Sequence, residues 1–562
     1  MRILFLCSRH NGLSQRAQVL LEELGHHLDI VEVVHGAQME AAAERFRPDV
    51  ILAPMLTARI PASIWRHYVC LVVHPGIPGD RGPSALDWAI LDGKRSWGVT
   101  VLEARDELDG GPIWAYREYP LRDASKSAIY RSETTQAAML AIQEALERFQ
   151  SEHRPPFDTD AVTNGSERPL CRQADRQIDW SASSERVLRH IRSADSAPGW
   201  KAALAGIEMY LYGAHREGHL RGQPGELLAT RDGAVCVACG DGAIWITHAR
   251  RRRGLRAGDP RHNIKLPIAD LLREQLAGVP ELPIAAAMQP SLPTWQPIRY
   301  REHGDTGYLY FDILNGAMSS AVLQRLLAAY RAARARPTRT LVLCGGEEFW
   351  CNGLDLNAIE AAPDPAQASW ENILAMNAWV REIVLTDDKR TVAWLRGNAG
   401  AGGVMLALAA DCVYANESVV LNPHYKGMGG LYGSEYWTYL LPRRVGEATA
   451  RLLTESLQPI GAARAQRIGL IDGVVADGRA LVALDEILAP GNRTDTWVLA
   501  LKAKAARRQE DESRKPLERF AEEELVAMRR NFFGPDPSYH VARRSFVRKQ
   551  AAMNGDMAVE RA

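Results

Sequence analysis

Short apolar runs alternate with amphipathic segments in the N-terminal part of the chain. The runs ILFLC, DVILAP and LVVHP have the length of buried strands, and a helical pattern around residues 15–24 separates the first two. A second helical pattern places Met139, Ile142, Leu146 and Phe149 on one face of a segment around 137–149. This alternation predicts a parallel sheet with helical crossovers, closed by the last helix.

The pattern changes twice further along the chain. Short strands between glycine-rich turns predict a small β-rich domain, and the prolines that follow exclude a helix or central strand. The runs YLYFDIL and TLVLCG, with a helix between them carrying Leu323, Leu326, Leu327 and Tyr330 on one face, then restart a strand and helix order. We therefore expect an α/β multidomain protein with domains at 1–160 and 161–275, a linker at 276–298 and a last domain at 299–562.

Composition narrows the class of protein. The 562 residues are 46% hydrophobic, and 68 basic residues balance 68 acidic ones, as in ordinary globular proteins without nucleic-acid partners. The chain begins without a signal-peptide pattern and has no apolar run long enough to span a bilayer, so we expect a cytoplasmic protein without a membrane partner. Cys236 and Cys239 have CxxC spacing but lack a second pair, which predicts structural cysteines in two strands around a Gly-Asp-Gly turn and no metal site.

One N-terminal stretch carries a candidate acid–base pair. In LVVHPGIPGDRGPSALDWAILDGKRSWGVTVLEARDELDGGPIW, His74 ends a predicted strand and Asp109 lies in a Gly-Gly-Pro turn. A histidine opposite a carboxylate can stabilise the oxyanion of a tetrahedral intermediate and shuttle the proton of a nucleophile. The stretch therefore favours acyl transfer, with His74 and Asp109 as catalytic residues.

The same stretch resembles a known family. His-Pro, Arg-Gly before a helix with a tryptophan, and Leu-Asp-x-Gly-Pro-Ile are similar to the formyl-tetrahydrofolate-dependent transferases and hydrolases. The later segment IDWSASSERVLRHIRSADSAPGW resembles the start of the small β-barrel appended to methionyl-tRNA formyltransferases. The resemblance implies a Rossmann-like formyltransferase domain, an OB-like β-barrel domain and formyl-tetrahydrofolate as cofactor.

The chain departs from this family at one position. The family has an asparagine two residues before its histidine, and Val72 stands there in this chain. A replacement amide is expected from the polar loop after the first strand, where Asn11 is the candidate catalytic residue and Arg9 and Gln15 are candidate cofactor-binding residues. A helix cap or turn is an equally weighted role for Asn11.

Three C-terminal stretches resemble the crotonase superfamily of enoyl-CoA hydratases and isomerases. They are LVLCGGEEFWCNGLDLNAI, VAWLRGNAGAGGVMLALAADCVYAN and LLPRRVGEATARLLTESLQPIGAARAQRIGLIDGVV. Asn-Gly-Leu-Asp brings a backbone N–H into a tight turn, and Ala-Gly-Gly opens a helix whose first N–H groups are unpaired, so two donors are available for an oxyanion hole. The alternative role of these glycines is close helix packing alone.

The resemblance implies a ββα spiral fold and a site for a coenzyme A thioester. It assigns the oxyanion-hole amides to Leu354 and Gly402, and contacts with coenzyme A to Asp355, Leu356, Gly403, Phe546 and Lys549. The two hydratase glutamates are replaced by Met405 and His424, which argues against hydration. Tyr425 and Glu435 are the expected proton-handling residues in their place, with their roles as acid and base left open.

The fusion of these two modules resembles the HypX and HoxX family of hydrogenase maturation factors. That resemblance implies carbon monoxide synthesis for nickel–iron hydrogenases, with formyl transferred from formyl-tetrahydrofolate to coenzyme A and then released as gas, and the hydrogenase maturation machinery as partner. Two alternatives remain: formyl transfer to an amine beside a divergent acyl-CoA module, or a coenzyme A-binding scaffold without catalysis.

Overall fold

The computed structural model describes residues 1–151, 165–252 and 258–549. The chain forms two compact units. The N-terminal unit contains residues 1–248, 274–280 and 292–294, and the C-terminal unit contains residues 249–273, 281–291 and 295–562. The formyltransferase-like and β-rich segments thus share one unit, and the proline-rich segment is divided between the two. The expected boundary at 160/161 lies outside the described residues.

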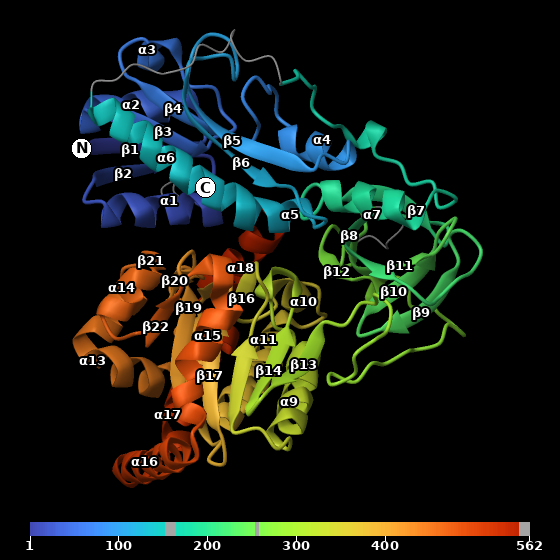
Figure 1. The fold of residues 1–562 in the computed structure, drawn as a ribbon, viewed down its shortest axis with the longest axis vertical. Coiled ribbons are helices and arrows are strands. Elements are labelled where there is room, and N and C mark those ends of the chain that lie inside the picture. The colour runs from blue at the N-terminus through green and yellow to red at the C-terminus, as the bar shows by residue number, and fades with distance from the viewer. Residues whose placement is uncertain (152–164, 253–257, 550–562) are drawn as a thin grey trace. The chain divides into compact units, whose positions relative to one another are not determined.

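A six-stranded sheet forms the first layer of the N-terminal unit (Figure 1). Its order is β2-β1-β3-β4-β5-β6, with β1, β2, β3 and β4 parallel to one another. The predicted parallel arrangement is confirmed for β1, β3 and β4, whereas β5 pairs antiparallel with β4 and also with β6. A short turn that contains Asp109 joins β5 and β6, and such a turn can only connect antiparallel neighbours. The bounds are β1 Arg2–Cys7, β2 His27–Glu32, β3 Val50–Met55, β4 Cys70–His74, β5 Ser96–Glu103 and β6 Ile113–Pro120.

Helices cover this sheet through their apolar faces. α6 packs on β5 and β6 and buries Met139, Ile142 and Leu146, as its periodicity predicted. α1 begins at Gly12, earlier than its apolar pattern indicated, because Asn11 caps it. The bounds are α1 Gly12–Glu23, α2 Gly36–Phe46, α3 Ala62–Trp65, α4 Ala85–Leu91, α5 Lys126–Ile129 and α6 Thr135–Gln150, with a π-helical turn at Tyr130–Thr134 before α6.

The β-rich part of this unit is a second sheet, in the order β7-β8-β11-β10-β9. The predicted strand pair around Gly-Asp-Gly is confirmed as β10 and β11, which pair antiparallel. Cys236 and Cys239 are buried there, and burial raises the pKa of both thiols, that of Cys239 to about 12. Neutral buried thiols fit the structural role. The bounds are α7 Ser184–Ser193, β7 Trp200–Leu204, β8 Ile207–Glu217, β9 Leu227–Arg231, β10 Ala234–Ala238 and β11 Ala243–Arg250.

The C-terminal unit repeats a pattern of strand, short strand and helix. The long strands form the sheet β13-β14-β15-β17-β19-β22, and the short strands form the sheet β16-β18-β20-β21. Each of the pairs β15–β16, β17–β18 and β19–β20 gives one strand to each sheet, as in the expected ββα spiral. The bounds are β13 Ile298–His303, β14 Thr306–Phe311, β15 Thr340–Cys344, β16 Phe349–Cys351, β17 Arg390–Leu395, β18 Asn398–Gly400, β19 Cys412–Asn416, β20 Val420–Asn422, β21 Ile460–Gly461 and β22 Gly473–Val475.

The core of this unit is dense in aromatic residues. Trp350 and Trp379 are fully buried and each meets Phe311 edge to face. Helices follow the short strands and the last strand: α9 Ser320–Arg334, α10 Leu356–Glu360, α11 Pro365–Val384, α12 Gly402–Leu408, α13 Trp437–Glu455, α14 Ala462–Arg467, α15 Ala480–Leu488, α16 Thr494–Arg514, α17 Leu517–Phe533 and α18 Ser538–Arg548.

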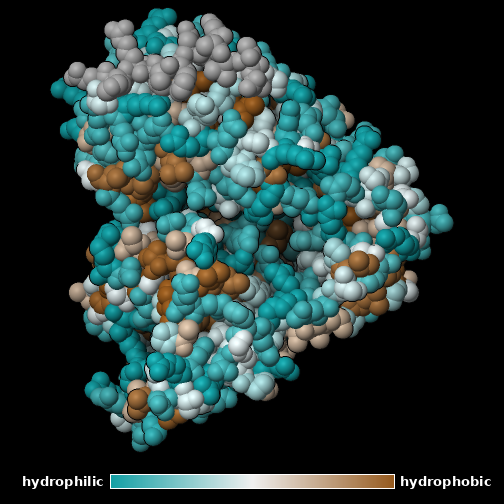
Figure 2. Space-filling view, viewed as in Figure 1, coloured by the Kyte–Doolittle hydropathy of each residue, from teal (hydrophilic) through white to brown (hydrophobic). Residues whose placement is uncertain are grey.

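The face in view is mostly hydrophilic, and its apolar residues lie in separate patches (Figure 2). Across the described residues, every helix is too short or too polar to cross a bilayer.

Candidate active sites

His74 ends β4 and lies between two carboxylates. Its Nε2 is 3.0 Å from Asp80 Oδ2, and its Nδ1 is 3.6 Å from Asp109 Oδ2. Asp109 Oδ2 also accepts a hydrogen bond from Gly82 N at 3.2 Å. The structure thus brings His74 and Asp109 together as the sequence predicted. Two flanking carboxylates hold the imidazole ring in place.

Asp80 is a residue that sequence reasoning missed. It is only 3% exposed and comes from the loop of glycines and prolines after β4. Gly76 lets this loop fold back, because a Cβ there would lie 2.4 Å from His74 Nε2 and 2.7 Å from Asp80 Oδ2. The available signal was an acidic residue six positions after His74, but only the path of the loop shows that it returns to the ring.

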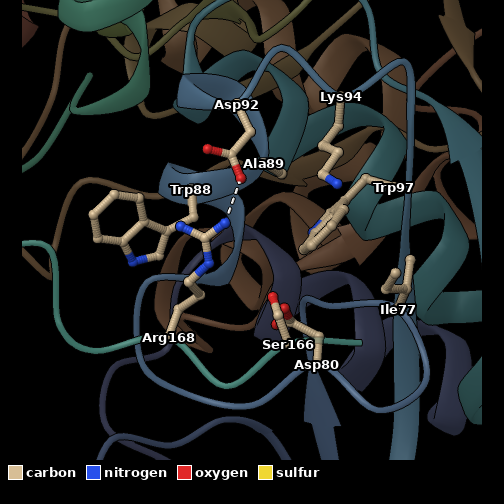
Figure 3. A pocket seen from close by; sticks show the side chains of 9 residues that line it. All are labelled: Ile77, Asp80, Trp88, Ala89, Asp92, Lys94, Trp97, Ser166 and Arg168. Carbon is tan, nitrogen blue, oxygen red and sulfur yellow. Dashed lines mark hydrogen bonds and ion pairs between the residues drawn. The ribbon is translucent and has the colours of Figure 1, made fainter. Parts of the chain in front are cut away.

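A small polar cavity lies beside Asp80 (Figure 3). Asp80 and Ser166 lie together in its centre, and Arg168 turns away to an ion pair with Asp92 at 2.8 Å. The segment with Ser166 and Arg168 runs along the Asp80 loop: Arg81 N donates to Ser166 O and Arg168 N to Arg81 O, each at 3.1 Å. The cavity is lined by Ile77, Asp80, Trp88, Ala89, Asp92, Lys94, Trp97, Ser166 and Arg168.

Asn11 caps α1 at the end of β1. Its Oδ1 accepts a hydrogen bond from Ser14 N at 3.0 Å. Burial raises the pKa of the Tyr130 hydroxyl, and a hydrogen bond with the Asn11 side chain opposes that shift. Gln15 Nε2 donates to His10 O at 3.3 Å, and Ser14 Oγ donates to Arg9 O at 3.4 Å. The capping role of Asn11 is therefore present, and its role towards a formyl oxygen stays a prediction.

The second site lies where the turn after β16 meets the start of α12. A Cβ on Gly353 would lie 3.6 Å from Gly402 N, so the Leu354 turn and the helix start are neighbours. The first N–H groups of α12 have no partner within the helix. Gly403 packs so closely that a Cβ would lie 2.0 Å from Cys351 O. Close packing thus explains Gly403, whereas Gly402 faces a carboxylate.

That carboxylate belongs to Glu435. A Cβ on Gly402 would lie 2.2 Å from Glu435 Oε1, and Glu435 Oε2 accepts hydrogen bonds from the Tyr425 hydroxyl at 2.8 Å and Ser434 N at 3.1 Å. Burial raises the pKa of Glu435 to about 7 and holds that of Tyr425 well above its usual value. A carboxyl group that titrates near neutrality can both accept and return a proton.

The two hydratase positions carry no carboxylate. Met405 is fully buried within α12, and burial lowers the pKa of His424, which favours its neutral form. The Tyr425–Glu435 pair, by contrast, brings a phenol and a carboxyl group, both able to exchange protons, next to Gly402.

Of the expected coenzyme A residues, Gly403 lies on α12 and the other four lie on or at the ends of α10 and α18. Asp355 caps α10 through Asn357 N and Ala358 N, both at 3.1 Å, and burial raises its pKa to about 6. Leu356 begins α10, Phe546 is 65% exposed on α18, and Lys549 ends α18 in the left-handed conformation. Ion pairs join the two helices, from buried Glu360 to Arg543 at 3.0 Å and to Arg548 at 3.2 Å.

Comparisons with known proteins agree with both modules. The families described as formyl transferase, formyl transferase C-terminal domain, and enoyl-CoA hydratase/isomerase match residues 25–145, 171–257 and 313–524. Hydrogenase maturation factor HoxX of Bradyrhizobium diazoefficiens is 45% identical over 98% of this chain and 95% of its own length. The structure of HypX from Aquifex aeolicus in complex with tetrahydrofolic acid matches with a TM-score of 0.94 and 44% identity over 98% of this chain and 96% of that one.

The chain belongs to the HoxX/HypX family of hydrogenase maturation factors. A partial relative, the methionyl-tRNA formyltransferase of Sorangium cellulosum, is 29% identical over 34% of this chain and 63% of its own length, which covers only the formyl transferase part. The HoxX/HypX chain thus joins a formyltransferase module to a crotonase-like module, and both modules are those of enzymes.

Proposed function

We propose that this HoxX/HypX chain transfers a formyl group from formyl-tetrahydrofolate to coenzyme A and then releases carbon monoxide from formyl-CoA. The observation that carries this proposal is the buried Tyr425–Glu435 pair beside Gly402. The crotonase-like module has the expected oxyanion-hole amides, lacks both hydratase glutamates and has another proton-handling pair. Such a site is suited to an acyl-CoA reaction other than hydration.

The first step needs a group that moves a proton and stabilises an oxyanion. His74, held by Asp80 and Asp109, would supply both, because its ring can receive the proton of the coenzyme A thiol as the thiolate attacks the formyl carbon. The ring can then return that proton to the folate nitrogen when the C–N bond breaks. Asn11, Arg9 and Gln15 at the end of β1 would orient the formyl donor. The tetrahydrofolic acid complex of the Aquifex aeolicus protein supports folate as that donor.

The second step breaks the C–H and C–S bonds of formyl-CoA and forms one S–H bond. The backbone N–H groups of Leu354 and Gly402 would hold the carbonyl oxygen and turn the formyl hydrogen towards Glu435. Glu435 and Tyr425 then divide the removal of this proton and the protonation of sulfur. Asp355, Leu356, Gly403, Phe546 and Lys549 are the residues that would hold coenzyme A.

The test supplies purified protein with coenzyme A and formyl-tetrahydrofolate labelled in the formyl carbon. We expect labelled carbon monoxide in the headspace. Labelled formyl-CoA without gas would leave only the first step, and a labelled amine product would favour the alternative formyltransferase. Binding of coenzyme A without any labelled product would favour the scaffold.

Two substitutions test the second site with formyl-CoA as substrate. Glu435→Gln preserves size and removes the carboxylate, and we expect carbon monoxide release to fall by about 10² to 10⁴-fold. Tyr425→Phe should reduce it by at least about tenfold, because no other hydroxyl group replaces the phenol in this buried pair. The exposed residues Glu455 and Tyr432 provide matched controls, Glu455→Gln and Tyr432→Phe. Wild-type gas release by both second-site variants would place the reaction elsewhere.

The family membership supports a role in hydrogenase maturation. The released gas would serve the assembly of a nickel–iron hydrogenase, and the maturation machinery of that enzyme is the proposed partner.

A further inference from the structure

Glu524 on α17 is a second buried carboxylate behind Glu435. It is fully buried, and four hydrogen bonds reach its two oxygens. Oε2 accepts from Tyr436 N at 3.0 Å and from Ser434 Oγ at 3.1 Å. Oε1 accepts from Thr438 N at 2.8 Å and from Thr438 Oγ1 at 2.6 Å.

These bonds hold the turn that carries Glu435. Glu435 and Tyr436 have φ values of 62° and 58°, a left-handed conformation that costs free energy in residues other than glycine. Asn377 secures the same turn, since its Oδ1 accepts from Glu435 N at 2.9 Å and its Nδ2 donates to Ser434 Oγ at 2.9 Å. Glu524 thus holds the Ser434 side chain before Glu435 and the backbone after it, and caps the start of α13.

The hydrogen bonds also indicate which carboxylate carries the charge. Two of the donors to Glu524 are backbone N–H groups, which can only donate, and one of them reaches each oxygen. Protonation of either oxygen would therefore weaken an existing bond. The hydroxyl of Tyr425 and the backbone N–H of Ser434 both donate to Oε2 of Glu435. Among the described residues this leaves Oε1 beside Gly402 and able to carry a proton.

We propose that Glu524 is a positioning residue of the second site, whose ionised carboxylate fixes the Glu435 turn and favours the protonated form of Glu435. The expected effect of Glu524 on reaction rate rests on the proposed release of carbon monoxide from formyl-CoA. With Glu524 charged nearby, Glu435 binds a proton near neutral pH and can also return it, as a proton-transfer group must. The charge of Glu524 adds to burial in raising the pKa of Glu435 to about 7, and burial also raises the pKa of Glu524 to about 7. The backbone N–H donors, one on each oxygen of Glu524, are therefore what assigns the charge to Glu524.

The tyrosines and the cysteine around the pair keep their protonation state near neutrality. Burial raises the pKa of Tyr425 well above its usual value, that of Tyr432 less strongly, and those of Tyr436 and Cys351 to about 12. Arg381 and Glu518, which face Tyr436, form an ion pair at 2.6 Å. Asp355 has a pKa of about 6, but the same residue is present in wild type and in every variant below. It therefore cannot account for a difference between their titration curves. A titration near pH 7 therefore belongs to Glu435 and Glu524 as a coupled pair.

The first experiment measures carbon monoxide release from formyl-CoA against pH in wild type and Glu524→Gln. Removal of the negative charge of Glu524 stabilises the ionised form of Glu435. The inflection of the pH–rate curve that belongs to Glu435 should therefore move to lower pH. The kcat should fall by roughly tenfold or more, while KM should change little. Glu523→Gln makes the same change at the adjacent, exposed position and should leave the profile as in wild type.

A second readout needs no turnover. Infrared spectra follow the C=O stretch of protonated Glu435, identified by its loss in Glu435→Gln, across the same pH range. In Glu524→Gln this signal should disappear at a lower pH than in wild type. An unchanged titration of Glu435 would overturn the proposal. If wild type releases no carbon monoxide, the proposed function fails, and the infrared titration still decides the role of Glu524.

Thr438→Val provides a milder variant in case Glu524→Gln does not fold. It removes one hydrogen bond from Glu524 and leaves the carboxylate in place. The ionised form of Glu524 is then less stabilised, so the negative charge of the coupled pair lies more often on Glu435. The infrared titration of Glu435 should then move to lower pH by a smaller amount. A shift to higher pH, or none, would contradict the assignment of the charge to Glu524.

Discussion

At the scale of single residues, the first site uses one side chain for two purposes. Asn11 caps α1 with its Oδ1, and its amide NH₂ group is the proposed replacement for the family asparagine that Val72 has displaced. Helix capping needs only an acceptor, whereas holding a formyl oxygen needs a donor. The two roles can therefore be separated chemically.

Asn11→Asp keeps the acceptor and removes the donor. If the amide holds the formyl oxygen, formyl transfer to coenzyme A should slow by roughly two to three orders of magnitude, and the thermal unfolding midpoint should stay near that of wild type. Asn11→Ala loses both roles and should also destabilise the protein by about 1 kcal/mol. A normal transfer rate in Asn11→Asp would reduce Asn11 to a helix cap and direct attention to Gln15 or Arg9.

At the scale of elements, the start of α12 builds the second site. Ala401 has a φ of 50°, so the chain turns sharply between β18 and the helix, and Gly402 becomes the first helical residue. The missing side chain at Gly402 makes the space in which Glu435 lies. The helix start and the Glu435 turn are thus fitted to each other.

Gly402→Ala tests this fit. The new methyl group would meet the end of the flexible Glu435 side chain, so the carboxylate must move while the backbone can stay. We expect carbon monoxide release from formyl-CoA to fall by about 10²-fold or more with little loss of thermal stability. Gly478→Ala is the control, because its methyl group meets nothing within 4 Å. Equal rates in both variants would show that Glu435 is not needed beside Gly402.

At the scale of the whole molecule, each compact unit has its own sheet, core and candidate site. His74, Asp80 and Asp109 all belong to the N-terminal unit, and Gly402, Tyr425 and Glu435 all belong to the C-terminal unit. The two proposed steps are therefore separable, since formyl-CoA enters the second step without the first.

Synthetic formyl-CoA should bypass the N-terminal unit. His74→Ala and Asp80→Asn should lose formyl transfer from formyl-tetrahydrofolate, the first by at least about 10²-fold, because the group that moves the proton or its partner is missing. Both variants should still release carbon monoxide from formyl-CoA at the wild-type rate, measured in the same headspace assay. A parallel loss of gas from formyl-CoA would mean that the two sites do not work separately.

The sequence by itself determined the classes of structure and most of the chemistry. Apolar periodicity predicted β1, β3, β4, α6 and the β10–β11 pair, because a buried face imposes its spacing on the chain. Motifs predicted His74 with Asp109 and the turn at Leu354, since the end of a strand and a glycine-rich turn can each be recognised from the residue types beside them. The loss of both hydratase glutamates was likewise recognised from the sequence, because Met405 and His424 stand at those positions.

Only the tertiary structure decided how distant segments complete these sites. The antiparallel pairing of β5 and β6, the return of Asp80 to His74, and the place of Glu524 behind Glu435 depend on loops whose path no local pattern encodes. Glu524 is separated from Glu435 by the whole of α13 to α16, and in the sequence it is one acidic residue among neighbouring acidic residues. Burial distinguishes it, because α17 turns this one carboxylate into the core while the adjacent Glu523 remains in solvent.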